Sequence, residues 1–355
     1  MKKFIYIFIV FIFCFSFFYV PQKPCHAQAD FYYTTNVEHL FTHGLIAYPE
    51  IAFNKNNFMA KHYHQDCITK NEFLNILTSL YQNNYVLINI NDCFETINNT
   101  TVKKSVKVPI GKKPIILSFD DINYDSKKLG LGMVDKIILD HNQNLATSTL
   151  INGKEDISYN NEFVTILENF VKEHPSFSPY GAKGTINLTG YDGILGYRTS
   201  HTNKANQESE ITRAKAVANC LLNLGWTFAS HSYGHYHMNK ISLNKFENEL
   251  KLWKSEVEPI VGKTQVYVYP YGEWQVFENG NICQKHKLLN QYGFNLFCGV
   301  GLKTFFGYLP NKNGHKVLFM DRKNLDGNSL CSNHPELKIF FNPQQILDEK
   351  RNFLN

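Results

Sequence analysis

The sequence predicts an α/β fold built on a parallel sheet. Apolar runs with many β-formers alternate with segments of helical periodicity along most of the chain, and several of these segments end at a glycine. Polar clusters also follow directly after three of the predicted strands. Because the catalytic groups of parallel α/β proteins gather where strands end, a barrel would bring these clusters together.

Each element follows from its local pattern. Strands are predicted over residues 39–47, 85–90, 114–119, 146–151, 226–230, 264–269 and 294–300. Helices are predicted over residues 69–82, 129–142, 161–173, 208–224, 245–261 and 281–292. Polar or glycine-rich connections are predicted over residues 54–66, 98–113 and 176–200.

Composition indicates a globular protein. Of the 355 residues, 43% are hydrophobic and 14% aromatic, which suffices for one large core or two modest ones. The 36 basic and 31 acidic residues give a formal net charge of +5 and are spread along the chain. This mild excess suits an anionic cell surface but does not indicate a nucleic-acid partner. The oligomeric state is not predicted.

The first 29 residues predict an export signal or an N-terminal anchor. Lys2 and Lys3 precede an apolar run over residues 4–20, and Ala-Gln-Ala at residues 27–29 offers the small-x-small pattern of a cleavage site. The run is at the short end of what spans a bilayer, so an uncleaved membrane anchor stays open. Either alternative places the rest of the chain outside the cytoplasm, secreted or attached to the cell envelope.

The cysteines do not form a recognisable site. Cleavage after residue 29 would remove Cys14 and Cys25 and leave six of the eight cysteines. These six contain no Cys-x-x-Cys pair, which disfavours a zinc ribbon or a thioredoxin-like motif. An oxidising compartment permits disulfides, and buried free thiols are the equally open alternative.

Two adjacent carboxylates, Asp120 and Asp121, follow the predicted strand over residues 114–119. Neighbouring carboxylates raise each other's pKa, so placing both at a strand end is costly. A divalent metal ion removes this cost, because it can bind one acid while the other accepts a proton. A pair of loop-capping acids is the structural alternative.

Two imidazoles, those of His231 and His235, follow the predicted strand over residues 226–230. Their spacing of four residues lets both reach one ion. One carboxylate and two imidazoles leave positions open for water and for a substrate carbonyl, as catalytic metal sites do. We interpret the nearby His237 as structural or peripheral.

Three motifs together resemble those of the polysaccharide deacetylase family, the NodB-type carbohydrate esterases: Ser118-Phe-Asp-Asp121, His231-Ser-Tyr-Gly-His235 and Tyr269-Pro-Tyr-Gly272. The resemblance covers roughly residues 38–323. It implies a distorted (β/α)7-type parallel barrel, NodB-like, in a catalytic domain over residues 30–325, with a C-terminal extension over residues 326–355. It also implies that Asp120 is the general base, and that Asp121, His231 and His235 bind one divalent metal ion, Zn²⁺ or else Co²⁺, Ni²⁺ or Mn²⁺.

Two departures from the family pattern concern the rest of the mechanism. Val268 stands where the family usually has the Arg that orients the base, and the late Leu-x-His that supplies the general acid is missing from residues 317–322. A circularly permuted subset, the poly-N-acetylglucosamine deacetylases, carries its acid on an N-terminal strand, and His43 in Phe41-Thr-His-Gly-Leu-Ile46 resembles that pattern. A strand histidine without a catalytic role is the alternative for His43. Weaker candidates for the acid are His62, His64 and His201.

Three further residues are predicted to contact substrate. Tyr271 and Trp274 can stack on the apolar face of a pyranose, and Arg198 is predicted as a contact from the loop over residues 176–200. Core aromatics and an ordinary surface arginine are the alternatives. The predicted reaction is metal-dependent hydrolysis of the N-acetyl amide of N-acetylglucosamine-type sugars in an extracellular or cell-wall polysaccharide. An inactive metal-containing glycan-binding module and an amide hydrolase for a non-sugar substrate stay open as alternatives.

Overall fold

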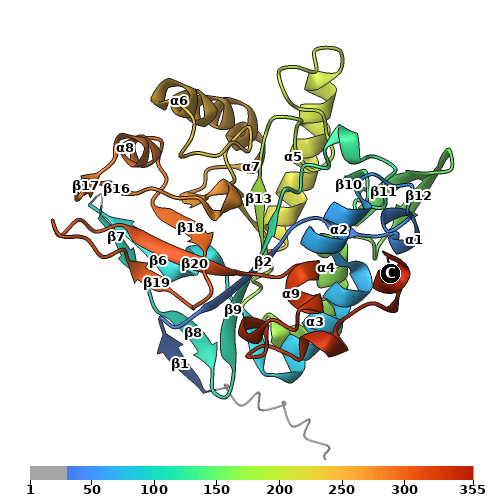
Figure 1. The fold of residues 1–355 in the computed structure, drawn as a ribbon, viewed down its shortest axis with the longest axis horizontal. Coiled ribbons are helices and arrows are strands. Elements are labelled where there is room, and N and C mark those ends of the chain that lie inside the picture. Colours follow the sequence, from blue (N-terminus) through green and yellow to red (C-terminus); the bar gives the residue numbers. More distant parts are fainter. Residues whose placement is uncertain (1–29, 99, 355) are drawn as a thin grey trace, which may run out of the picture. The chain divides into compact units, whose positions relative to one another are not determined.

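Seven parallel strands close into a barrel in the computed structural model, which describes residues 30–98 and 100–354 (Figure 1). In order around the barrel they are β2 (Glu38–Thr42), β9 (Lys113–Asp120), β13 (Thr185–Leu188), β14 (Thr227–Ser230), β15 (Val266–Val268), β18 (Leu296–Val300) and β20 (Leu318–Asn324). Every neighbouring pair is parallel, and β20 closes the ring by pairing with β2. The prediction of a distorted (β/α)7-type parallel barrel is confirmed.

Helices cover the outside of the barrel. They are α3 (Lys70–Gln82), α4 (Phe163–Glu173), α5 (Gln207–Asn223), α6 (Leu243–Leu252), α7 (Glu258–Val261) and α8 (Gln284–Gln291). The predicted start of α3 is confirmed, because the side chain of Thr69 accepts a hydrogen bond from the Glu72 N–H and the Glu72 carboxylate accepts one from the Thr69 N–H. The larger apolar core lies between these helices and the strands.

Alternation along the strands decides which side chains enter the barrel. In β9, Ile115 and Leu117 join the helix-facing core, whereas Ile116 joins a second cluster inside the barrel. Residues two apart on a strand share a face, so Asp120 lies on the inner face with Ile116. In β20, Met320 belongs to the same inner cluster, which places Arg322 on the inner face too. The barrel interior therefore receives charged side chains near its C-terminal end.

Smaller strands flank the barrel. β5 (Tyr85–Leu87) pairs with β9 outside the ring, and β19 (Phe306–Tyr308) runs antiparallel to β20. Elsewhere β1 (Phe31–Thr34) pairs with β8 (Val106–Pro109), and β6 (Phe94–Ile97) with β7 (Thr100–Lys103). These pairs account for the β-rich connector predicted over residues 98–113.

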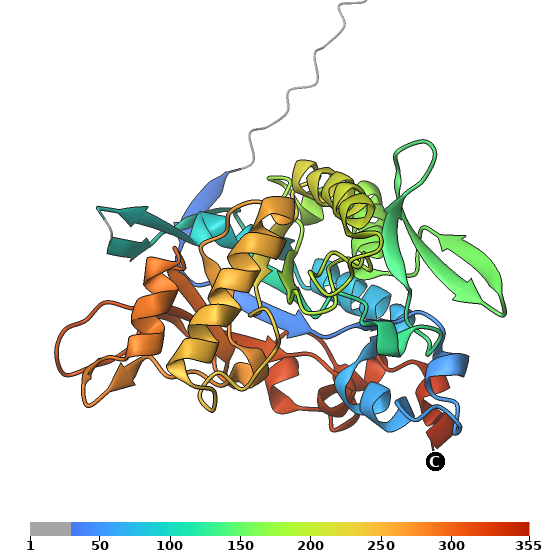
Figure 2. The ribbon, with the colours of Figure 1, turned by 90° about the horizontal axis from the view of Figure 1, so that it is seen from above.

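The predicted helix over residues 129–142 is wrong. This segment contains β10 (Lys136–Leu139), which joins β11 (Leu145–Ile151) and β12 (Lys154–Ser158) in an antiparallel sheet that projects beside the barrel (Figure 2). Gly130 and Gly132 have positive φ angles and interrupt any helix there. The carboxylate of Asp140 accepts hydrogen bonds from the Asn142 and Asn144 N–H groups and thereby builds the turn into β11.

Three other segments differ from prediction. The predicted connection over residues 54–66 contains α2 (Ala60–Asp66), and the predicted loop over residues 176–200 contains the barrel strand β13. The strand predicted over residues 39–47 ends at Thr42, so His43 lies in the short link to β3 (Leu45–Ile46). Short apolar runs lack the length needed to mark element boundaries, which tertiary pairing sets here.

The end of the chain packs onto the catalytic barrel. After α9 (Gly327–Cys331), the chain returns to α3, where the Arg351 guanidinium binds the buried Glu72 carboxylate at 2.5 and 2.6 Å. The proposed export signal lies outside the described residues. In the part of the chain that is described, no helix is both long and apolar enough to cross a membrane. The six cysteines there are free thiols.

Candidate active site

Strand ends deliver the polar clusters to one edge of the barrel. Asp120 is the last residue of β9, and His231 comes directly after β14. Between these strands lies β13, whose Asn187 pairs in register with Asp120. The backbone then turns sharply, because Asp121 and His235 both have left-handed φ angles, of 61° and 53°. These turns bring residues from separate strands to one point.

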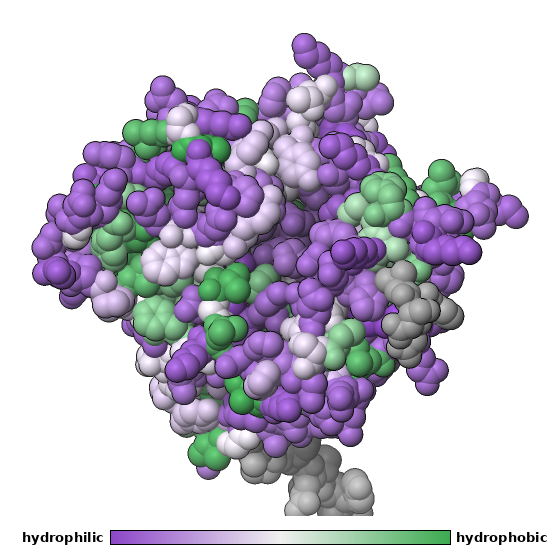
Figure 3. All heavy atoms as spheres, viewed as in Figure 1, coloured by the Kyte–Doolittle hydropathy of each residue, from purple (hydrophilic) through white to green (hydrophobic). Residues whose placement is uncertain are grey.

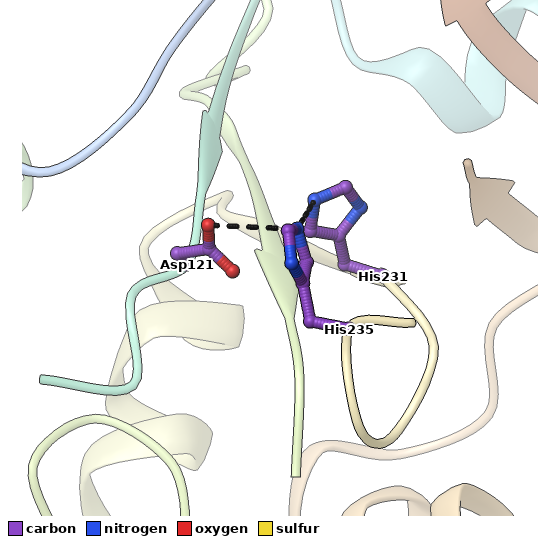
Figure 4. A group of neighbouring side chains, drawn as sticks. All are labelled: Asp121, His231 and His235. Carbon is purple, nitrogen blue, oxygen red and sulfur yellow. Dashed lines mark hydrogen bonds and ion pairs between the residues drawn. The ribbon is translucent and has the colours of Figure 1, made fainter. Parts of the chain in front are cut away.

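Asp121, His231 and His235 converge on a site suited to a metal ion (Figure 4). One ligand atom from each lies within 4.8 Å of the other two. The Nε2 atoms of the two histidines are 3.2 Å apart, and His235 Nε2 is 3.8 Å from Asp121 Oδ2. Four ligands at about 2.0–2.1 Å around a tetrahedral zinc ion are separated by about 3.3 Å. The donor set and its spacing therefore fit a divalent ion such as zinc.

The protein fixes the tautomer of His231. Its Nδ1 lies 3.0 Å from the carbonyl oxygen of Val268, which can only accept, so Nδ1 carries the proton and donates it. The lone pair of Nε2 is thereby directed at the site. A hydrogen bond of this kind from the second ring nitrogen is the usual support of a metal-binding histidine.

Burial and neighbouring charges set the protonation states of the other two groups. Burial lowers the pKa of His235 to about 4, so its imidazole is neutral near neutral pH, as a metal ligand requires. Burial on its own would raise the pKa of Asp121, but the nearby His235 and His231 outweigh it and lower that pKa. Asp121 is therefore a carboxylate, ready to bind a cation.

Asp120 lies beside this group and is held by two partners. Its Oδ1 accepts hydrogen bonds from Asn187 Nδ2 at 2.6 Å and from Arg322 Nη1 at 2.8 Å, while Oδ2 accepts one from Arg322 Nη2 at 3.1 Å. Burial raises the pKa of Asp120, but Arg322 and His231 more than offset this and hold the pKa well below its usual range. Asp120 is a fixed, ionised carboxylate.

A cavity of about 420 Å³ opens over these residues. Its wall includes all four predicted base and metal residues together with His43 and the apolar side chains of Phe41, Met133 and Val300. The far side is formed by His62 and Asp66 of α2. The site thus has a charged floor and a partly apolar wall, as small-molecule and sugar sites do.

Comparison with known proteins gives the family. Residues 197–292 match the family model described as polysaccharide deacetylase. This segment is polysaccharide deacetylase sequence. It contains His231, His235 and the Tyr-Pro-Tyr-Gly motif, and it confirms the predicted family and enzyme class. The circularly permuted subtype stays a prediction.

Solved structures of similar overall shape were also found. The deacetylase PplD of Streptococcus pyogenes, in complex with acetate, is 16% identical, with a TM-score of 0.44 over 82% of this chain and 93% of that one. A polysaccharide deacetylase from Bacillus cereus is 14% identical, with a TM-score of 0.42 over 83% and 68%. The chitin deacetylase of the fungus Colletotrichum lindemuthianum is 12% identical, with a TM-score of 0.26 over 54% and 76%. A search of curated proteins found no match.

The arginine that the deacetylase motifs lack is replaced from another strand. Val268 contributes only its carbonyl group, to His231, whereas Arg322 of β20 makes the paired contact with Asp120. The expectation that no arginine orients the base is therefore corrected. Sequence reasoning searched for the arginine at the usual motif. The available signal was an arginine in the apolar run over residues 317–322, at the same parity as Leu318 and Met320.

His43 lies at the same site although it comes from the N-terminal strand. It lines the cavity, and its charge contributes to lowering the pKa of both Asp120 and Asp121. Its Nδ1 atom is buried and has no hydrogen-bond partner within the described residues. Of the weaker candidates, His62 lines the opposite side of the cavity, while His201 is paired with Glu256 at 2.6 Å. The barrel brings His43 to the centre, because β2 is the neighbour of β9.

The three residues predicted to contact substrate lie in different surroundings. Tyr271 lines the cavity, is 55% exposed and stacks on His237 at 4.0 Å. Trp274 lies outside the lining and packs on Phe319. Arg198 is also outside it: its guanidinium donates to Asp192 and to the Tyr124 carbonyl oxygen, which holds the loop to the barrel. Of these three, the structure brings only Tyr271 to the cavity.

Proposed function

We propose that this chain is a metal-dependent N-deacetylase that removes acetyl groups from N-acetylglucosamine-type sugars of an extracellular or cell-wall polysaccharide. The observation that carries the proposal is the convergence of Asp121, His231 and His235 within 4.8 Å, next to the fixed carboxylate of Asp120. A three-ligand site of this composition leaves room for water and a substrate oxygen. A purely structural site would be closed by a fourth protein ligand.

The residues around the centre have complementary roles. A divalent ion held by Asp121, His231 and His235 would supply Lewis-acid polarisation of the acetyl carbonyl and acidify a water molecule. Asp120 accepts the proton of the attacking water, and Arg322 and Asn187 keep its carboxylate in place.

The leaving nitrogen needs a proton donor on another side of the cavity. We assign this role to His43, which supplies a proton to the departing glucosamine nitrogen. The Tyr271 N–H donates to no acceptor within the described residues and is available to the developing oxyanion. The exposed ring of Tyr271 offers a flat surface to a pyranose. Products are acetate and a free amine.

Release of acetate tests the proposal. The full chain is incubated with acetylated chito-oligosaccharides, with and without a chelator, and with Zn²⁺, Co²⁺, Ni²⁺ or Mn²⁺ restored. Acetate release that stops with the chelator and returns with a metal supports the proposal. Metal binding without release from any glycan favours the inactive glycan-binding module, and release only from non-sugar amides favours the alternative hydrolase.

The location of the protein is part of the proposal. The basic pair and apolar run at residues 2–20 support export, with the chain then secreted or held at the cell envelope. Fractionation of cells that express the full chain tests this, because protein found only in the cytoplasm would contradict it.

A further inference from the structure

Aromatic side chains cover the outer face of the sheet formed by β1 and β8. Phe31 lies opposite Pro109 and Tyr33 opposite Lys107, so these four side chains share one face. The other face carries Val106 and Val108, which are buried. Tyr33 is 64% exposed, and the Lys107 ammonium lies 3.8 Å from the ring centroid of Phe31. An outward sheet face in water is normally polar, so this one calls for a partner.

Lysines surround this face without acidic partners. Between residues 103 and 113 the sequence has five lysines and no acid: Lys103, Lys104, Lys107, Lys112 and Lys113. In the described part of the chain, none of them forms an ion pair with a carboxylate. Lys103 donates to the Phe306 carbonyl and Lys112 to the Asn84 side chain, whereas Lys107 and Lys113 lie over aromatic rings. The local charge is therefore uncompensated, which the even spread of charge along the sequence had concealed.

An apolar residue stands at the tip of the same region. Ile110 is 64% exposed in the turn between β8 and β9, where Gly111 has a φ of 80°. Tyr180, which is 47% exposed, lies close enough for Lys107 to reach its ring. We call this group the basic aromatic surface; its members are Phe31, Tyr33, Lys104, Lys107, Ile110, Lys112, Lys113 and Tyr180. By contrast, the face seen in Figure 3 is mostly hydrophilic, with hydrophobic residues in small groups.

The basic aromatic surface and the cavity lie at opposite ends of the barrel. Lys113 begins β9 and Asp120 ends it, which separates them by roughly 23 Å at the rise of a β-strand. In Figure 1, β1 and β8 lie at the lower end of the molecule, and β9 rises from them. A flat partner bound at this end leaves the cavity open to the other side.

We propose that the basic aromatic surface docks on an anionic lipid membrane. Tyrosine and other aromatic rings favour the membrane interface, and lysines near it are attracted by acidic headgroups. The chain also enters β1 directly after the apolar run over residues 4–20 and its short linker, so the same end of the domain follows the one segment suited to lipid. A second copy of the chain is a poorer partner, because two such lysine-rich surfaces repel each other. The proposal does not depend on the catalytic one.

Tryptophan probes in the full chain test the docking. Ile110→Trp places a reporter in the surface, and Leu302→Trp is the matched control, since Leu302 is 66% exposed and follows β18 at the cavity end. Both variants are mixed with vesicles of brominated phosphatidylglycerol or brominated phosphatidylcholine, and the unmodified chain gives the background. We expect the Ile110→Trp signal to be quenched strongly on the anionic vesicles, and the Leu302→Trp signal to be unaffected on both.

Charge reversal completes the test. Each lysine near an anionic surface contributes a factor of about five in binding, so Lys104→Glu, Lys107→Glu and Lys113→Glu combined should abolish the quenching at position 110, even where the N-terminal run keeps the chain on the vesicle. The milder lysine-to-glutamine set should weaken it, which guards against misfolding of the reversed variant. Equal quenching at both positions, quenching indifferent to lipid charge, or a signal change that follows protein concentration without lipid overturns the proposal.

Discussion

Arg322 on β20 donates hydrogen bonds to both carboxylate oxygens of Asp120 on β9, over 2.8 and 3.1 Å, and both side chains are almost fully buried. The Arg322 guanidinium also lies 4.0 Å from the ring centroid of Phe41. A planar guanidinium matches a carboxylate in two places at once, so it fixes the orientation of the base and not only its charge. This contact joins the last strand of the barrel to the predicted catalytic strand.

Replacing this arginine tests its positioning role. Arg322→Lys keeps the positive charge but loses the paired hydrogen bonds, so we expect kcat to fall by about 10- to 100-fold, with metal content and KM nearly unchanged. Steady-state kinetics and metal analysis measure these effects. Arg213→Lys, on the exposed side of α5, is the control and should behave as the unmodified enzyme. An unchanged kcat in Arg322→Lys would show that Asp120 needs no such support.

The two adjacent aspartates should respond differently to substitution. Asp121→Ala removes a metal ligand and should deplete the purified protein of metal, whereas Asp120→Asn should retain the metal and lose turnover. Metal analysis by mass spectrometry and acetate release separate the two effects. If Asp120→Asn lost the metal while Asp121→Ala kept it, the roles of the two residues would be reversed.

His43 is the candidate donor of the proton to the leaving amine. His43→Ala should lower turnover by roughly 10²–10⁴-fold, the usual contribution of a general acid, and should leave metal content unchanged. His62→Ala, at the opposite wall of the cavity, is the matched comparison and should have a smaller effect. Loss of metal from His43→Ala, or full turnover in it, would contradict this assignment.

A buried acid away from the metal ligands makes stability depend on pH. Burial raises the pKa of Glu162 to about 8, from an ordinary value near 4.5. Between these values the folded state holds a proton that the unfolded state has released, so the free energy of unfolding falls as pH rises, by up to about 1.4 kcal/mol per pH unit. Glu162→Gln removes this dependence and should become progressively more stable than the unmodified chain from pH 5 to pH 8.

Urea unfolding at several pH values measures that difference. Glu50→Gln is the control, because Glu50 is exposed and should give a constant difference. A Glu162→Gln variant whose stability relative to the unmodified chain did not change over this range would mean that Glu162 is ionised in the folded protein.

The buried pair of Glu72 and Arg351 should stabilise the C-terminal segment. Arg351→Met leaves the Glu72 carboxylate buried without its partner, which costs about 3–5 kcal/mol. Lys350→Met is the neighbouring control: its ion pair with Glu50 is exposed and should contribute less than about 1 kcal/mol. Urea unfolding compares the two. Equal, small losses would indicate that the segment after residue 326 contributes little to the fold.

The sequence by itself determined the fold class and the four residues at the predicted metal and base positions. Strand and helix alternation is a local property, because it follows from the spacing of apolar side chains along a few residues. The clusters at Asp120, His231 and Tyr269 also lie in short contiguous motifs at strand ends. Local patterns failed where a segment was short or polar, as at β10 and at α2, because pairing and packing with distant segments decide such cases.

Only the tertiary structure decided how the site is completed. Arg322 lies 202 residues from Asp120, and no local pattern links them. The closure of β20 on β2, and of β2 on β9, brings Arg322, His43 and Asp120 to one end of the barrel interior. The physical reason is that ring closure sets which strands are neighbours, while strand alternation sets which of their side chains point inward. The same closure sets the cavity and the basic aromatic surface at opposite ends.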